Sequence, residues 1–187
     1  MMMTRHFMRI LPIAACLSVS LTLGVALWPA AALAQPSRAE AMQALAGVEW
    51  TLETDAITAL GDGAEQTLMA IADDDSLLNV YRIRALMALK LFQTSDVADY
   101  LESRLAVWSN DALSRRTMES FSAGFAQTYP QRVASALTPY LANGNPHLRI
   151  TAARALRSLN TAQARVAVNA YLSDRAQSWE IEALQNE

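Results

Sequence analysis

The sequence predicts an all-α protein, and three observations lead to this fold class. Apolar residues beyond residue 35 recur at spacings of three and four, as on one face of an α-helix. Residues that begin and end helices divide this region into short segments, and similar segments return about every 30 residues. With 187 residues, of which 52% are apolar and 18% charged, the chain is too apolar to be disordered and long enough for one domain.

The first 34 residues have the pattern of a secretory signal peptide. Arg5 and Arg9 precede an uncharged apolar run over residues 10–27, and the small-residue end Ala32-Leu33-Ala34 follows. We expect cleavage after Ala34 and export to a bacterial periplasm or secretion. The alternative is an uncleaved anchor, because about 18 apolar residues are just enough to span a membrane. That alternative implies a membrane-tethered assembly factor.

Cleavage at this position changes the composition. The single cysteine, Cys16, and His6 leave with the signal peptide, so that His147 is the one remaining histidine. The basic residues fall from 15 to 13 against 18 acidic ones, for a net charge of −5. Disulfides, a cysteine nucleophile and a Cys/His metal cluster are therefore excluded for the mature chain. The acidic balance does not favour nucleic-acid binding, and no second apolar stretch is long enough to span a membrane.

Start and stop signals place the helices of residues 35–187 in order. They are a capping box at Ser37–Glu40, Gly47, the break Gly61-Asp62-Gly63, the N-cap residues Asp96 and Thr161, and Asn145-Pro146. Pro139 falls inside an expected helix over residues 130–142, and we expect it to kink that helix or end it early. No alternating segment of useful length predicts a strand.

An internal repeat organises these helices. The segment YRIRALMAL (81–89) matches LRITAARAL (148–156) at Arg, at both Ala and at the final Leu. Looser copies begin at residues 52, 113 and 179. The expected helices between the copies cover residues 64–72, 97–107, 130–142 and 162–172. Two helices in each period of about 30 residues predict a helical solenoid, because one such hairpin cannot bury its apolar face alone.

The repeat resembles the HEAT-like repeats, especially the short bacterial type related to those of bilin lyases. The resemblance is clearest in NGNPHLRITAARAL (143–156), next in residues 73–89, and it covers residues 35–187. It implies a right-handed α-solenoid of about four and a half HEAT-like hairpins. The arginine of the family pattern is present as Arg82 and Arg149. Elsewhere its position holds Glu53, Ser114 and Glu180, and this predicts irregular stacking.

The resemblance also implies a function, since HEAT-like proteins are mostly scaffolds that bind other proteins. It implies no enzyme activity and no cofactor. A non-catalytic relative or subunit of a tetrapyrrole-lyase-type enzyme remains the alternative from another class. The residues offer little chemistry of their own: His147 has no partner for a metal, and the Asp73-Asp74-Asp75 run lacks the ligand spacing of a calcium site. We expect neither catalytic residues nor a metal site.

The candidate contact residues lie two and five places after the arginine of the family pattern. These positions are expected to point away from the core, on the face formed by the second helices of the hairpins. The residues expected to contact a partner are Arg84, Met87, Arg116 and Arg154. With Lys90 and Arg157 they form a basic ridge, which suits a protein with an acidic surface. An ordinary solvated face with ion pairs inside each helix is the alternative.

Trp108 is a further candidate, as an anchor for a partner. It stands beside Ser109-Asn110-Asp111, where we expect a turn and partial exposure of the indole. The identity of the partner does not follow from these residues.

Overall fold

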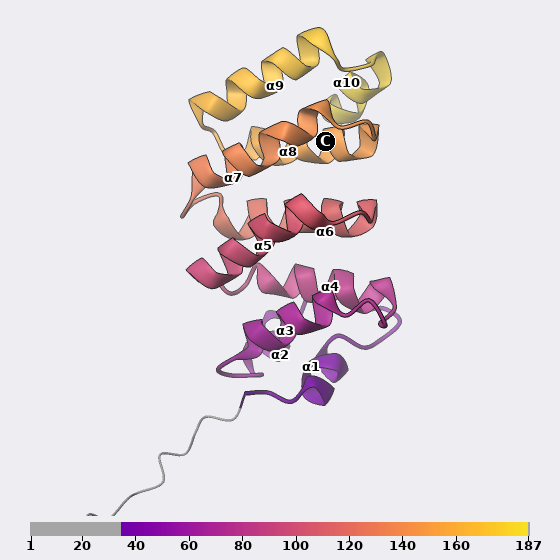
Figure 1. Cartoon of the computed structure of the whole chain (residues 1–187), viewed down its shortest axis with the longest axis vertical. Helices are drawn as coiled ribbons and strands as arrows, with labels where there is room; N and C mark the ends of the chain where they lie inside the picture. Colours follow the sequence, from indigo (N-terminus) through magenta and orange to yellow (C-terminus); the bar gives the residue numbers. More distant parts are fainter. Residues whose placement is uncertain (1–34, 187) are drawn as a thin grey trace, which may run out of the picture. The chain divides into compact units, whose positions relative to one another are not determined.

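The computed structural model describes residues 35–186, which belong to one compact unit, and this unit is all-helical (Figure 1). The predicted signal peptide, residues 1–34, lies outside the described residues. Residues 35–186 form ten α-helices and one 3₁₀ helix, with no strand among them. The predicted all-α class is therefore confirmed. Within this part of the chain, no helix is both long enough and apolar enough to cross a membrane.

The helices are short and follow one another closely. The first four are α1 (Arg38–Ala44), α2 (Thr54–Thr58), α3 (Ala64–Asp73) and α4 (Asn79–Leu89). The next four elements are α5 (Ser95–Val107), α6 (Asp111–Phe125), α7 (Pro130–Leu137) and the 3₁₀ helix η1 (Thr138–Ala142). The last three are α8 (Pro146–Ser158), α9 (Ala162–Asp174) and α10 (Ser178–Gln185).

Two rows of helices build this unit. Helix α4 packs on α6, α6 on α8 and α8 on α10, while α5, α7 and α9 form the second row. In the first row, α4, α6 and α8 also pack against neighbours in the chain: α4 on α3, α6 on α5, and α8 on α9. Figure 1 shows these elements following one another in chain order. The expected helices over residues 64–72, 97–107 and 162–172 are confirmed as α3, α5 and α9.

Side-chain caps set the starts of α1, α5, α6, α8 and α9. Ser37 and Glu40 form the predicted capping box, and Oγ1 of Thr161 accepts the N–H of Ala164 at 3.1 Å. The expected N-cap at Asp96 is wrong. Thr94 holds that place, since its backbone is extended and its Oγ1 accepts the N–H of Val97 at 3.3 Å. Asp96 lies in the first turn of α5, where a carboxylate still favours the positive end of the helix dipole.

The predictions for Pro139 and for the first repeat copy differ in outcome. Pro139 ends α7 early, as predicted: the α-helix stops at Leu137 and continues as η1. The repeat copy expected over residues 52–60 yields only the five-residue helix α2. Its N-cap residue, Glu53, makes no capping side-chain hydrogen bond, and Gly61 turns the chain in the left-handed region at φ +79°.

The core lies between the two rows. Its largest fully buried side chains include Phe121 and Phe125, whose ring centroids are 5.7 Å apart. The small residues of the repeat, among them Ala85 and Ala152, are fully buried and let neighbouring helices approach closely. Gly124 allows another close approach, because a Cβ there would lie 3.1 Å from the backbone of Lys90.

Asn160 offers a test of the turn between α8 and α9. It has φ +49°, a left-handed conformation that Asn tolerates better than residues with aliphatic side chains. We expect Asn160→Ala to lower the free energy of unfolding by about 1 kcal/mol, and Asn160→Gly to leave it unchanged or raise it. Urea unfolding monitored by circular dichroism measures both changes. Equal losses in the two variants would contradict this account.

Candidate interaction surface

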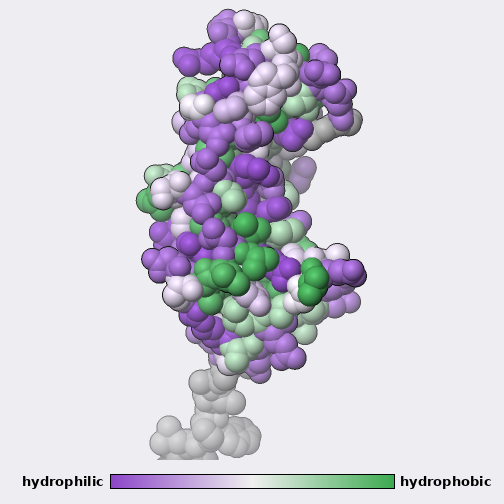
Figure 2. Space-filling model, turned by 90° about the vertical axis from the view of Figure 1, so that its right-hand side faces the viewer, coloured by the Kyte–Doolittle hydropathy of each residue, from purple (hydrophilic) through white to green (hydrophobic). Residues whose placement is uncertain are grey.

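An apolar groove lies beside α4, where the loop 45–53 crosses the helix. Its volume is about 540 Å³. The residues that line it are Trp50, Thr51, Leu52, Val80, Ile83, Arg84 and Met87. Exposed hydrophobic side chains in the same loop and at the beginning of α4 are Val48, Leu78 and Val80, with Val48 fully exposed. Figure 2 shows hydrophobic surface gathered in the lower half of this unit, toward its N-terminal helices.

Arg84 holds the loop against the helix. Its Nη1 donates to the carbonyl of Leu45 at 2.7 Å, and its Nη2 donates to that of Gly47 at 2.9 Å. Both carbonyls follow the end of α1, where a helix leaves carbonyls without partners of its own. The same guanidinium lies 5.2 Å from the ring centroid of Trp50, whose Nε1 donates to the carbonyl of Ala44 at 2.9 Å. Hydrogen bonds therefore hold the loop 45–53, which forms one side of the groove, in a fixed position.

The other arginines of the basic ridge have partners inside the chain as well. Arg116 forms an ion pair with Glu119 at 2.7 Å, one turn along α6. Nη2 of Arg154 donates to the carbonyl of Ala183 at 2.8 Å, and Nη1 of Arg157 donates to that of Leu184 at 2.5 Å. Arg154 and Arg157 thus do at the end of α10 what Arg84 does at the end of α1.

Two arginines of the ridge lack a carboxylate partner in the described part of the chain. Within residues 35–186, neither Arg84 nor Arg157 has a carboxylate within salt-bridge distance, so each keeps an uncompensated positive charge. By contrast, Arg38 pairs with Asp74, Arg104 with Asp73, and Arg132 with both Asp99 and Glu102.

The structure brings only two of the predicted contact residues together. Arg84 and Met87 share the groove, while Arg116 lies on α6 and Arg154 on α8, outside it. Not every position that the repeat predicts to be exposed on this face is exposed. Thr151, expected to point outward from α8, is buried and donates to the carbonyl of His147 at 2.9 Å.

Trp108 is half-buried at the end of α5 and takes part in internal contacts. Its Nε1 donates to Oγ1 of Thr117 at 3.0 Å. The guanidinium carbons of Arg82 and Arg104 lie 5.2 and 6.0 Å from its ring centroid. Four further residues of the groove were not predicted from the sequence: Trp50, Leu52, Val80 and Ile83. Their signal was the helical spacing of Val80, Ile83 and Met87 on α4, together with Trp50 and Leu52 in the loop before it.

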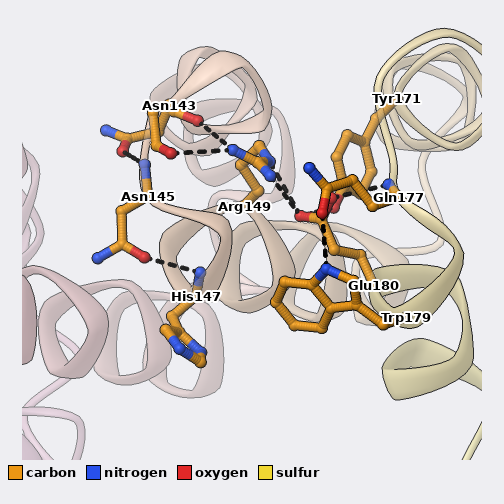
Figure 3. A network of polar contacts seen from close by, with 9 residues as sticks. Asn143, Asn145, His147, Arg149, Tyr171, Gln177, Trp179 and Glu180 are labelled. Carbon is orange, nitrogen blue, oxygen red and sulfur yellow. Dashed lines mark hydrogen bonds and ion pairs between the residues drawn. The ribbon is translucent and has the colours of Figure 1, made fainter.

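A buried polar network joins α8 to the last two helices (Figure 3). Glu180 is fully buried and accepts from Nε of Arg149 at 2.9 Å, from the hydroxyl of Tyr171 at 2.9 Å and from the backbone N–H of Gln177 at 2.8 Å. Nη1 of Arg149 donates to the carbonyl of Asn143 at 2.8 Å. The contacts of Glu180 and Arg149 thus join α8 and the segment before it to α9 and α10.

The pKa values in this network follow from its contacts. Burial favours the neutral form of Glu180, but the hydrogen bonds from Arg149, Gln177 and Tyr171 outweigh it and hold the pKa below its ordinary value of 4.5. Burial and the hydrogen bond to Glu180 raise the pKa of Tyr171 to about 12. At neutral pH the network therefore holds a carboxylate, a guanidinium and a neutral phenol.

The remaining candidates have structural surroundings. His147 is exposed, and its ring meets Trp179 edge-on at 6.1 Å between centroids. Asp73 accepts from Tyr100 and Arg104, and Asp74 accepts from Ser76 and Arg38, which lowers the pKa of Asp74 to about 2. Across residues 35–186, His, Cys, Asp and Glu side chains form no group of three or more that could hold a metal ion.

Comparisons with known proteins add no relative: no protein-family model matches the chain, and no curated protein or solved structure is significantly similar to it. The resemblance to HEAT-like repeats therefore rests on the residues of the repeat alone.

The Arg149–Glu180 pair predicts how stability depends on pH. Because the folded-state pKa of Glu180 lies below 4.5, the ionised pair stabilises the fold above that pH, and its contribution is lost as the pH falls through the folded-state value. We expect Glu180→Gln to lower the free energy of unfolding at pH 7 by about 3 kcal/mol, since it leaves Arg149 without its carboxylate.

Urea unfolding at about pH 7 and about pH 3 measures this effect. The variant is expected to lose less stability on acidification than the wild type does. Glu182→Gln, on the exposed face of the same helix, serves as the matched control and is expected to change neither value by more than about 0.5 kcal/mol. An equal pH dependence in the wild type and Glu180→Gln would contradict the assignment.

Proposed function

We propose that the chain is an exported scaffold, a right-handed α-solenoid of HEAT-like hairpins that binds another protein through the face carrying α4, α6 and α8. The succession of paired helices supports the solenoid. The arginines of the family pattern support it too, since Nε of Arg82 donates to the carbonyl of Ala72 at 2.9 Å, as Arg149 does to Asn143. The same position thus performs the same task in two hairpins.

The observation that carries the binding role is the apolar groove beside α4. Exposed apolar surface in a groove is a common feature of protein-binding sites, because its burial against a partner is favourable. The groove combines Trp50, Ile83 and Met87 with a backbone fixed by Arg84. A preformed site of this kind loses little conformational entropy when a partner binds.

The partner is a protein segment that has apolar side chains and at least one carboxylate. The apolar side chains would fill the groove, and a carboxylate would approach Arg84, whose hydrogen-bonded partners are neutral carbonyls. A guanidinium retains its full charge when it donates to carbonyls, and it has further N–H groups to offer. Arg157 extends the same preference along the ridge.

Export is proposed from residues 1–34. The basic start, the apolar run over residues 10–27 and the end at Ala34 match a cleaved signal peptide. A chain without cysteine after Ala34 needs no disulfide to fold in the periplasm.

Crosslinking in intact cells tests the binding face. A photo-activated amino acid in place of Met87 is expected to capture a discrete partner, because this position lines the groove. The same amino acid at Val166, which is 70% exposed on α9, is the matched control and is expected not to capture that partner. Mass spectrometry then identifies the captured protein.

Binding of the purified partner completes this test. Ile83→Glu places a charge in the groove and is expected to weaken binding at least about tenfold, whereas Val166→Glu is expected to leave it unchanged. Circular dichroism shows that both variants remain folded. The same affinity in both variants would place the binding site elsewhere.

The N-terminus of the accumulated protein tests the export step. We expect Edman sequencing to begin at Gln35, because cleavage follows Ala34. Cell fractionation is expected to find this form in the periplasm or the medium. A chain that retains residues 1–34 and sediments with the membranes would instead support the tethered assembly factor.

A further inference from the structure

A second hollow opens between the end of α5, the beginning of α6, η1 and the beginning of α8. Its volume is about 530 Å³. Two carboxylates, Glu102 and Asp111, contribute to its walls together with Trp108, Tyr140 and Ser114, and no basic residue lines it. The groove beside α4 shares none of these residues, so the two sites are independent of each other.

The hollow exists where the repeat lacks its arginine. Arg82 and Arg149 occupy the equivalent position in α4 and α8, and each donates to carbonyls of the segment that precedes its helix. In α6 this position is Ser114, whose short side chain is buried and forms part of the wall. The break at Pro139, which replaces the end of α7 by η1, shapes the opposite side.

The charges of the hollow are not balanced within its lining. Oε2 of Glu102 accepts from Nε of Arg132, so this carboxylate already has a cation. Asp111 instead accepts only a neutral hydrogen bond, from Nδ2 of Asn145 at 2.6 Å. Within residues 35–186 it forms no ion pair. An exposed carboxylate therefore lines the hollow without a cation of its own, on the helix whose repeat position holds Ser114 in place of arginine.

We propose that this hollow binds the side chain of an arginine supplied by a second protein. A guanidinium would pair with Asp111 and lie against Tyr140, which matches its planar shape and its several donors. The hydroxyl of Ser114, in the lining of the hollow, would be a further acceptor. The ring of Trp108 forms a further wall, and the guanidinium groups of Arg82 and Arg104 lie within 6.0 Å of its centroid.

Nuclear magnetic resonance of the protein in the form that cells accumulate tests this proposal. The probe is the blocked tripeptide Gly-Arg-Gly, and the signal is the indole N–H of Trp108, which donates to Thr117 beside the hollow. We expect a saturable shift of this signal with a dissociation constant in the millimolar range. The same tripeptide with citrulline, which has nearly the same shape and no charge, is expected to bind at least about fivefold more weakly.

Two variants locate the binding site. Asp111→Asn keeps an acceptor for Asn145 but removes the charge, and is expected to weaken binding of Gly-Arg-Gly at least about fivefold. Ser114→Arg supplies the arginine of the repeat from within the chain and is expected to abolish binding. Should Ser114→Arg fail to fold, Asp111→Asn and the citrulline peptide still decide the matter.

Three outcomes would overturn the proposal: no saturable shift at Trp108, equal binding of the citrulline peptide, or unchanged binding by Asp111→Asn. Equal binding of Gly-Lys-Gly would contradict the preference for a guanidinium. Ile83→Glu, which alters only the groove beside α4, is expected to bind Gly-Arg-Gly as the wild type does. Failure at one site is thereby distinguished from failure at the other.

Discussion

Contacts between arginine side chains and the carbonyls at helix ends join the short helices of this protein to one another. A helix leaves its last four carbonyls without partners inside the helix, and a chain of short helices has many such ends. Five arginines donate to carbonyls at or near these ends. They are Arg82, Arg84, Arg149, Arg154 and Arg157. Each arginine connects its own helix to the end of another helix or to the segment that follows it.

The two proposed binding sites are consequences of this arrangement. Where Arg84 reaches the end of α1, it fixes the loop 45–53 and creates the apolar groove. Where Ser114 stands in the place of an arginine, space remains between α5, η1 and α8. One site therefore arises from an arginine that is present, and the other from an arginine that is absent. The groove shares no residue with the buried Arg149–Glu180 network, whereas Asn143 both accepts from Arg149 and lines the hollow.

Local signals predicted the helices well because they act within a few residues. The capping box at Ser37, the cap at Thr161 and the early end at Pro139 depend on neighbouring backbone groups, and the structure confirms them. Asp96 shows the limit of such signals. Asp96 and Thr94 are both suitable cap residues, and the extended backbone at Thr94 decided between them.

The sequence by itself determined the helical class and the helix starts at Ser37, Asn145 and Thr161, since periodicity and capping are local properties of the chain. The tertiary structure alone decided what each arginine contacts. Arg84 meets carbonyls 39 and 37 residues away, and Arg154 meets one 29 residues away. Such partners depend on how neighbouring hairpins stack. For the same reason, the apolar groove depends on the tertiary structure, because residues of the loop 45–53 and of α4 line it together.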